Sequence, residues 1–325
     1  MRMLQMAKTT IVIPNYNGMK YIDGCLSSVY QGFVVPEVIL VDNGSTDGSL
    51  SLVKEKYPSV KIVEFDKNTG FSRAVNEGIK TARTKYVLLL NNDTVVGQEM
   101  TARLEEAMEE HPEIFSAGAK MINLHEKNKL DGAGDFYCAL GWAYARGKDR
   151  PADSYNNPGR IFAACAGAAI YRRELFEKIG CFDENHFAYL EDIDIGYRAN
   201  IYGYPNRYVP GAEVLHAGSA VSGSRHNAFK VRLSARNSIY LIYKNMPFLQ
   251  ILLNLPFLLA GYLVKLLFFS LKGMGVAYGK GLLEGVKLSV SGKGRKNKVK
   301  FRMRNMKNYL WIQGQLWINI VRRLV

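Results

Sequence analysis

Short apolar segments alternate with helix-like segments through the first hundred residues of the chain. The apolar segments are Thr9–Ile13, Val38–Val41, Val60–Phe65 and Tyr86–Leu90, and the helix-like segments between them are residues 21–30, 49–57 and 71–82. Strands of this kind, separated by helices, form a mostly parallel sheet that is covered on both faces. In such sheets ligands bind beyond the carboxyl ends of the strands. The sequence therefore predicts an α/β fold with its binding site along that edge.

Polar residues follow three of these four strands at the point where each strand ends. Pro14-Asn15 closes the first strand, Asp42-Asn43 the second, and Asn91-Asn92-Asp93 the fourth. Asp93 could bind a hard divalent cation through its carboxylate oxygens, and Asp42 could accept hydrogen bonds from a nucleobase or a ribose hydroxyl. Each of them could instead be a turn or helix-capping residue. Their common position at strand ends favours a shared ligand site.

A second acidic cluster, Glu191-Asp192-Ile193-Asp194, begins a predicted helix over residues 191–202. Acids in a first helical turn are stabilised by the helix dipole, so capping is the alternative interpretation. The preceding residues 187–190 are largely aromatic or apolar, which favours a walled pocket in which Asp192 could act as a general base toward a hydroxyl. His216, which ends a predicted strand, is a candidate second metal ligand.

The segment Asn68–Arg73 opens the predicted helix over residues 71–82. Gly70 permits a close approach of the backbone to a ligand, and a helix N-terminus favours anions. Arg73 could reach the phosphates or the base of a nucleotide. A diphosphate that leaves a sugar develops negative charge, which a divalent cation stabilises. These features together predict an enzyme that activates a nucleotide-linked leaving group.

The positive charge of the chain is concentrated near its end. The net charge is +14, and residues 272–325 hold 13 Lys and Arg but one acid, Glu284. The remainder of the chain is therefore close to neutral. This asymmetry predicts an anionic surface as partner, either a membrane or a nucleic acid, and we favour the membrane.

An apolar segment before the basic tail, Phe248–Leu271, is long enough to cross a bilayer. Gln250, Asn254, Pro256 and Lys265 interrupt it, and a basic tail after it favours the cytoplasmic side. We therefore expect a monotopic or re-entrant arrangement of two short helices bent at Pro256, with a buried core helix as the alternative. The predicted division is a catalytic domain over residues 1–236 and a helical, basic, membrane-associating region over residues 237–325.

Two further observations bear on the compartment. The first eight residues lack the apolar core of a signal peptide, so we expect the catalytic part on the cytoplasmic face of the cell membrane. The four cysteines form no Cys-x-x-Cys pair, which is typical of reduced, buried thiols.

Several of these motifs occur in the order typical of family 2 glycosyltransferases. They are Val41–Asp47, Asn68-x-Gly70-Phe71, Leu90–Asp93, Gly180–Glu184, Glu191–Asp194 and His216-x-Gly218, and the resemblance covers about residues 8–245. The chain is especially similar to the rhamnosyltransferase-like branch, which acts in cell-surface polysaccharide assembly. The resemblance implies a GT-A fold, inversion at the anomeric carbon, and dependence on Mg²⁺ or Mn²⁺.

The resemblance also implies residue roles. Asp42 would contact the nucleoside and Asn92 the ribose, and the further nucleotide-sugar-binding residues would be Pro14, Asn15, Asn43 and Arg73. The metal would be bound by Asp93 and His216. Asp192 would be the base, and the acceptor would be bound by Glu191 and Asp194. One departure is that Asn91-Asn92 stands where the family has acids. The expected donor is a nucleotide-diphosphate sugar, with dTDP-rhamnose as one candidate, and the expected acceptor is lipid-linked or a cell-surface glycan.

Two other classes of function share part of this evidence. A sugar-1-phosphate nucleotidyltransferase would use the same sheet edge, but it needs a basic, glycine-rich loop after the first strand, and residues 14–18 hold one glycine and no cation. A non-catalytic membrane or nucleic-acid binding protein is suggested by the basic residues 293–307. A dinucleotide-binding dehydrogenase is disfavoured because no Gly-x-Gly-x-x-Gly follows the first strand.

Overall fold

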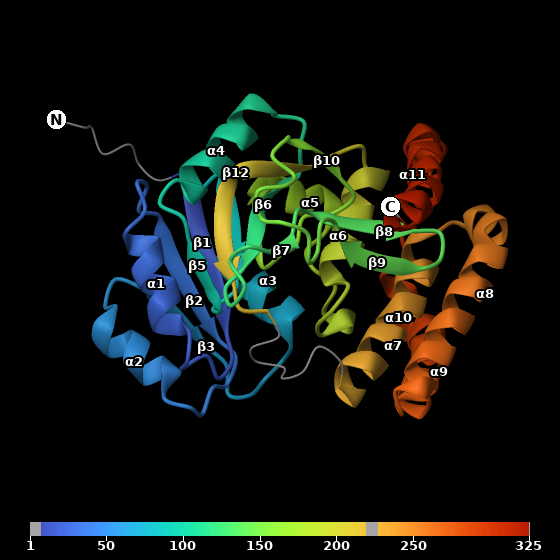
Figure 1. Ribbon diagram of the computed structural model, residues 1–325, viewed down its shortest axis with the longest axis horizontal. Helices are drawn as coiled ribbons and strands as arrows, with labels where there is room; N and C mark the ends of the chain where they lie inside the picture. The colour runs from blue at the N-terminus through green and yellow to red at the C-terminus, as the bar shows by residue number, and fades with distance from the viewer. Residues whose placement is uncertain (1–7, 219–226, 325) are drawn as a thin grey trace.

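The computed structural model describes residues 8–218 and 227–324 (Figure 1). Its central sheet is formed by strands that lie between Thr9 and His216 in the sequence. Four of its strands run parallel in the order β4-β1-β2-β3, and their bounds are β1 Thr9–Asn15, β2 Glu37–Asp42, β3 Lys61–Glu64 and β4 Tyr86–Leu90. Asn15 pairs with Asp42 in register, so the last residues of β1 and β2 lie side by side. The predicted parallel sheet and its four strands are confirmed.

The other half of the sheet is mixed and more irregular than the sequence indicated. Antiparallel β11 (Ala168–Arg172) separates β4 from β6 (Ser116–Asn123), and β12 (Asn206–His216) runs parallel to β6. Shorter strands complete the sheet: β5 Thr94–Val96, β7 Leu130–Gly132 and β10 Gly159–Ile161. Strands β10 and β11 are separate, and β12, which ends at His216 as expected, is one strand with a bulge between Val209 and Glu213. Pro210 lies in that bulge, where a ladder donor is not needed.

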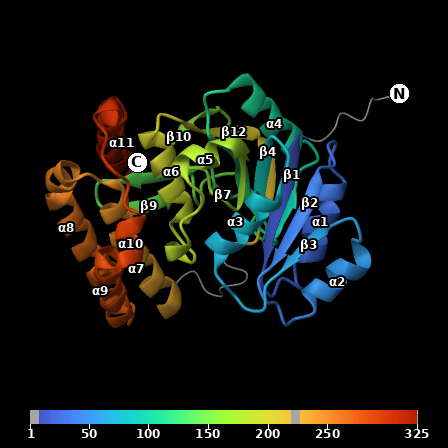
Figure 2. The same ribbon diagram turned by 180° about the vertical axis from the view of Figure 1, so that it is seen from behind.

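Helices cover both faces of the sheet (Figures 1 and 2). Their bounds are α1 Ile22–Tyr30, α2 Ser49–Lys56, α3 Phe71–Thr81, α4 Met100–Glu110, α5 Phe176–Ile179 and α6 Glu191–Ile201, with the single 3-10 turns η1 Arg173–Leu175 and η2 Glu184–His186. Apolar residues of α1, α2 and α4 pack with Ile11 and Ile13 of β1, whereas those of α3 and α6 pack in the cluster that holds Val12. Successive side chains of β1 point to opposite faces of the sheet, so this strand contributes to the hydrophobic cores on both faces.

The C-terminal region is a group of helices joined to a β-hairpin. The helices are α7 Ala228–Asn245, α8 Phe248–Leu271, α9 Gly275–Val290, α10 Gly292–Lys296 and α11 Met306–Leu324, with η3 at Met303–Asn305. The hairpin of β8 (Asp135–Cys138) and β9 (Trp142–Ala145) reaches toward them (Figure 1). The expected domain boundary at 236/237 falls inside the continuous helix α7.

The expected bend of residues 248–271 at Pro256 is wrong, because α8 is one helix of 24 residues with Pro256 inside it. Residues on both sides of Pro256, including Gln250, Asn254 and Leu258, are buried against the rest of the protein. This packing continues across the proline and holds the two halves of the helix together, although proline removes one helical hydrogen bond.

The packing of α3 on β1 gives a first prediction. A Cβ atom added to Gly78 would lie 2.2 Å from Val12 Cγ1, whereas one added to Gly24, on the exposed side of α1, meets nothing within 4 Å. We expect Gly78→Ala to lower the free energy of unfolding by about 1–3 kcal/mol through overpacking. The matched variant Gly24→Ala should raise it by about 0.5–1 kcal/mol through helix propensity. Urea denaturation of the two variants checks both signs, and equal effects would contradict the packing argument.

Candidate active site

Three polar side chains are joined by hydrogen bonds at the carboxyl ends of β1, β2 and β4. Asn15 Nδ2 donates to Asp42 Oδ1 over 2.9 Å, and Asn92 Nδ2 donates to Asn15 Oδ1 over 2.8 Å. The second oxygen of Asp42 accepts the Ser45 backbone N–H over 2.9 Å. All three side chains are buried, so their orientation is fixed by these bonds. The expected nucleotide-binding residues Asn15, Asp42 and Asn92 are therefore neighbours.

Asn43 joins the end of β2 to the loop before α3. Its Oδ1 accepts the Thr69 backbone N–H over 2.8 Å, and its Nδ2 donates to the Gly70 carbonyl over 3.2 Å. Arg73 is exposed on the first turn of α3, with its guanidinium 5.7 Å from the centre of the Phe65 ring. Pro14 is half-buried and pairs in register with Val41. Asn43 thus orders the loop, whereas Arg73 keeps its charged end accessible.

Asp93 and His216 meet where β5 pairs with the end of β12. His216 Nε2 lies 3.3 Å from Asp93 Oδ1, and His216 Nδ1 lies 2.7 Å from Asp131 Oδ2. Burial disfavours the charged imidazole, but the hydrogen bonds to Asp131 and Asp93 outweigh it and raise the pKa of His216 to about 9. The two expected metal ligands are adjacent, and Asp131 is a third group that the sequence analysis did not include.

The chemistry of these side chains fits a divalent cation. Asp131 accepts from Nδ1, which orients the ring so that Nε2 faces Asp93, and this is the arrangement in which carboxylates commonly support a metal-binding histidine. A carboxylate and an imidazole together suit Mn²⁺ or a similar ion. Asn91 Nδ2 lies 3.4 Å from the same Nε2, so an amide stands where an acid would add another charged ligand.

Asp192 forms a carboxyl pair with Asp135 at the N-terminus of α6. The ligand atoms of Asp135, Asp192 and Cys165 lie within 4.8 Å of one another, and all three residues are partly exposed. Burial raises the pKa of Asp192 to about 6, and burial and the neighbouring Asp192 raise the pKa of Asp135 well above its usual range. Asp135 therefore holds a proton more strongly than Asp192 does, and it donates a hydrogen bond to the Asp192 carboxylate.

The loop before α6 holds Asp192 in place through unusual backbone conformations. Phe187, Tyr189 and Leu190 have φ values of 63°, 70° and 66°, which are uncommon for residues with a side chain. The buried Asn237 of α7 donates to the carbonyls of His186, Ala188 and Tyr189 over 2.8–2.9 Å. These bonds stabilise a conformation that the loop would not adopt alone.

The other two acids of α6 lie in different surroundings. Glu191 is 8% exposed, and burial followed by the nearby Asp192 raises its pKa to about 8. Asp194 is fully buried and binds Arg198, Lys244 and Asn245. Asp194, an expected acceptor-binding residue, thus has both of its carboxylate oxygens occupied by these internal partners.

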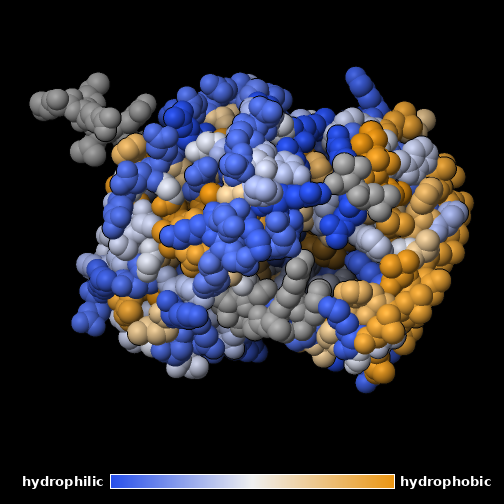
Figure 3. All heavy atoms as spheres, in the orientation of Figure 1, coloured by the Kyte–Doolittle hydropathy of each residue, from blue (hydrophilic) through white to orange (hydrophobic). Residues whose placement is uncertain are grey.

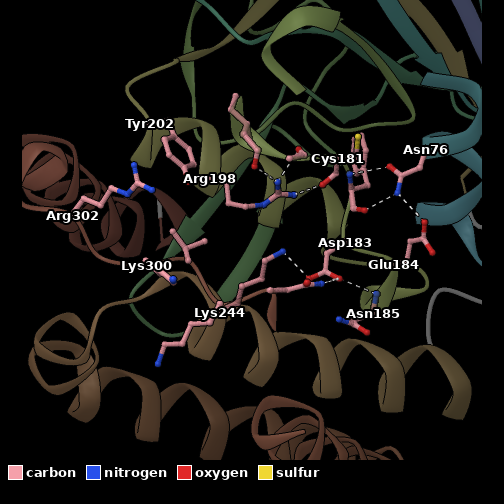
Figure 4. Close-up of a pocket in the computed structure, with 16 residues that line it drawn as sticks. Asn76, Cys181, Asp183, Glu184, Asn185, Arg198, Tyr202, Lys244, Lys300 and Arg302 are labelled. Atoms are coloured by element: carbon pink, nitrogen blue, oxygen red, sulfur yellow. Dashed lines mark hydrogen bonds and ion pairs between the residues drawn. The ribbon is translucent and has the colours of Figure 1, made fainter. Parts of the chain in front are cut away.

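A cavity of about 680 Å³ lies beside this buried cluster, between η2 and the segment after α10. Figure 4 shows Lys244 reaching Asp183, and Lys300 and Arg302 lie on the lining of the cavity. The family motif Gly180–Glu184 forms part of this wall, where Arg198 donates to the carbonyls of Gly180 and Cys181 over 2.9 and 2.8 Å. The motif therefore has a structural role in the described chain, apart from the carboxyl pair.

The side chains expected to share one site are connected through short contacts, and they are those of Asp42, Asp93, Asp192 and His216. Asp42 is linked to Asn92 through Asn15, the next residue Asp93 contacts His216, and His216 contacts Asp131. Asp131 and Asp135 flank a glycine-rich turn, Gly132-Ala133-Gly134, and Asp135 bonds Asp192. Backbone hydrogen bonds also bring the segment after β4 close to Asp192. The Asn91 backbone N–H donates to the Gly167 carbonyl over 2.9 Å, and the Asp192 carboxylate accepts from the backbone N–H of the adjacent Ala166.

Comparison with known proteins identifies the family. The sequence model described as glycosyl transferase family 2 matches residues 10–180, which is more than half of the chain. This chain belongs to glycosyltransferase family 2. It is 27% identical over 232 residues to N-acetylglucosaminyl-diphospho-decaprenol L-rhamnosyltransferase of Mycobacterium tuberculosis. The aligned region covers 63% of this chain and 75% of the relative. The predicted resemblance to the rhamnosyltransferase-like branch is confirmed, and the protein is a glycosyltransferase.

Two solved structures share the fold. GalNAc-T7 with UDP, GalNAc and Mn²⁺ has a TM-score of 0.59 at 16% identity, covering 74% of this chain and 48% of that one, so this chain spans about half of its length. A mannosyltransferase from Pyrobaculum calidifontis with GDP-Man and Mn²⁺ has a TM-score of 0.54 at 18% identity, covering 94% of this chain and 85% of that one. The predicted GT-A fold is confirmed.

The carboxyl pair gives a second prediction, for the pH dependence of activity. A base must be ionised, so activity should fall as the pH drops through the pKa of Asp192. Asp135→Ala removes the donor to the Asp192 carboxylate and should move this acid limb to higher pH. Asp135→Asn keeps an N–H donor and should leave the limb close to its original position. The pH dependence of kcat/KM for both variants checks this, and an unmoved limb in Asp135→Ala would contradict the pairing.

Proposed function

We propose that this family 2 enzyme is an inverting, metal-dependent transferase that moves a sugar from a nucleotide-diphosphate donor to a hydroxyl of a lipid-linked or cell-surface glycan acceptor. The observation that carries the proposal is the occurrence of two paired groups, Asp93 with His216 after strand β4 and Asp135 with Asp192 at the N-terminus of α6, joined by the short segment Asp131–Asp135. The mycobacterial relative is named for transfer of L-rhamnose to a diphospho-decaprenol acceptor, which supports the acceptor class and makes dTDP-rhamnose a candidate donor.

The donor nucleotide would lie at the ends of β1, β2 and β4. Asp42 and Asn92, oriented by Asn15, offer a carboxylate and an amide for the base and the ribose. Arg73 is accessible on the first turn of α3, where both its charge and the helix N-terminus favour an anion. Asn43 supports this part of the site indirectly, because it holds the loop from which α3 begins.

Asp93 and His216 would hold Mg²⁺ or Mn²⁺, with Asp131 orienting the histidine. When bound, the ion would stabilise the negative charge that develops on the leaving diphosphate. A single carboxylate at this position, with Asn91 and Asn92 as amides, supplies less negative charge than two acids would. The protein groups would therefore bind the ion together with the donor phosphates rather than alone.

Asp192 would act on the acceptor. Its carboxylate accepts the proton of the acceptor hydroxyl as that oxygen attacks the anomeric carbon, while the bond to the diphosphate breaks on the opposite side of the sugar. One displacement of this kind inverts the configuration. Burial raises the pKa of Asp192 to about 6, which makes it a stronger base than an exposed aspartate yet keeps it ionised near neutral pH. Glu191, next to it, is the remaining candidate for an acceptor contact.

The proposed location is the cytoplasmic face of the cell membrane, where a lipid-linked acceptor and a soluble nucleotide sugar can meet. The support is the apolar helix α8 followed by the basic tail, and the named lipid-linked acceptor of the mycobacterial relative. An anionic membrane surface is the proposed partner for the tail in place of a nucleic acid.

The base assignment gives a third prediction. Asp192→Asn should reduce sugar transfer at least a thousandfold while nucleotide-sugar binding stays within about threefold, because the amide cannot accept the proton. Glu110→Gln, an exposed acid at the end of α4, is the matched control and should transfer at the original rate. A panel of nucleotide sugars, with and without Mn²⁺, supplies the donor, and retained turnover in Asp192→Asn would refute the role.

The metal assignment gives a fourth prediction. Asp131→Ala should weaken Mn²⁺ binding in the presence of a nucleoside diphosphate by about 10–100-fold, since it removes the group that orients His216. Lys148→Gln removes the other ion-pair partner of Asp131 but leaves the histidine contact, so its Mn²⁺ affinity should change much less. Titration calorimetry or the electron paramagnetic resonance of free Mn²⁺ measures both, and equal losses would contradict the orienting role.

A further inference from the structure

One side of α8 is apolar and exposed along its whole length. Leu249, Leu259 and Leu271 are 77%, 63% and 90% exposed, and Val276 and Leu283 of the adjacent α9 are 73% and 65% exposed. Figure 3 shows these helices as a continuous hydrophobic surface at the right edge of the molecule. An apolar surface of this extent on a globular protein is typical of an interaction site.

The other side of α8 is fastened to the body of the protein. Its buried residues Gln250, Asn254, Leu258 and Gly261 follow one another at intervals of four, four and three, which places them on one stripe of the helix. Asn254 exchanges two hydrogen bonds of 2.8 Å with Gln313 of α11, and Gln250 accepts from Tyr197 of α6 over 2.8 Å. Trp142 of the hairpin donates to the Gly261 carbonyl over 3.1 Å.

These contacts conflict with a helix that crosses a bilayer. In the described chain α8 alone is long and apolar enough to do so, at about 36 Å for its 24 residues. Its attachments, from Gln250 to Gly261, are spread over nearly half of that length, so a crossing would either break them or draw α6, α11 and the hairpin into the hydrocarbon. Exposed backbone and polar groups of those elements would be costly there.

Charge indicates what covers the apolar face. Residues 293–307 contain eight Lys and Arg, all exposed, and none of them forms an ion pair within the described chain. Glu284, the one acid after residue 247, is paired with Arg232. A second copy of this chain would carry the same uncompensated positive charge, whereas anionic lipid headgroups would neutralise it.

We propose that α8 and α9 lie in the plane of an anionic bilayer, with their apolar sides among the outer parts of the lipid chains and residues 293–307 at the headgroups. This inference rests on the membrane location in the proposed function and adds the orientation, since it excludes α8 as a spanning helix. Because the buried stripe of α8 is attached to the catalytic body, the body and both ends of the helix lie on the same side of the membrane.

This orientation also fixes the distance between the membrane and the carboxyl pair. A Cβ atom added to Gly261 would lie 2.2 Å from the Leu140 carbonyl oxygen, so the tip of the hairpin rests directly on α8. Strand β8, about 10 Å long over its four residues at the rise of an extended strand, leads from beside that tip to Asp135. The hairpin thus acts as a spacer that holds the acceptor side of the site near the lipid surface.

Flotation of the full chain with vesicles tests the docking. We expect binding to vesicles of phosphatidylcholine with phosphatidylglycerol, at least tenfold weaker binding to phosphatidylcholine alone, and weakening by salt. Replacing Leu252 and Leu263 together by Glu should reduce binding at least tenfold. The matched control replaces Phe33 and Val35, exposed residues of the α1–β2 loop, by Glu and should bind as before. Equal losses in the two double variants, or a stable dimer that buries α8 without lipid, would overturn the proposal.

Depth measurements test the orientation. In a background that lacks both accessible cysteines, Cys165→Ser with Cys181→Ser, one cysteine introduced at Leu249, Leu259 or Leu271 carries an environment-sensitive dye, and lipids with quenchers at defined depths report its position. An in-plane helix gives three similar, shallow depths, whereas a spanning helix places Leu259 far deeper than the ends and would overturn the proposal.

Hydrolysis of the donor in detergent is measured separately. Its loss counts against the proposed function alone, and its retention without vesicle binding counts against the docking alone.

Discussion

The parallel pairing of β1 with β2 and β4 is the constraint on which the site depends. It places the last residues of three strands at one edge, where Asn15 bonds both Asp42 and Asn92. Because strands in such a sheet are buried on both faces, polar groups gather where the strands end and the backbone opens to solvent. The mixed half of the sheet then brings His216 to the same edge through the pairing of β12 with β5.

Electrostatic surroundings separate the acids of a single helical turn into different roles. Asp194 lies against Arg198 and Lys244, and these cations hold the pKa of its carboxyl far below its usual range despite burial. Asp192, two residues earlier, bonds another carboxyl in place of a cation, and burial raises its pKa. The first is a permanent charge that fastens α6 to α7, and the second can exchange a proton near physiological pH.

The sequence was sufficient for the elements with clear periodicity and insufficient where contacts are non-local. Strand β4 begins and ends where its apolar pattern does, and the metal and base candidates Asp93, His216 and Asp192 were found from their place at strand ends or at a helix start. Asp131 and Asp135 were missed, because their importance comes from pairing across 85 and 57 positions of sequence. Two acids around Gly132-Ala133-Gly134 were the available signal. Asp194 was expected to bind the acceptor, because its cationic partners lie on α7 and one turn later in α6 and are not evident from the local sequence.

Helix α7 has a consequence for how such enzymes can be recombined. It supplies Asn237 to the loop before α6 and Lys244 to the buried ion pairs, and α11 returns to bond the hairpin, with Tyr144 donating to the Asn319 carbonyl over 2.7 Å. The last third of the chain is therefore bonded to α6, to the loop before it and to the hairpin of β8 and β9, and is packed into the body of the protein. A chimera that joins this N-terminal part to the tail of another family member would inherit mismatched contacts on both sides of the junction. Swapping whole tails should therefore be far less productive than changing the exposed apolar side chains of α8.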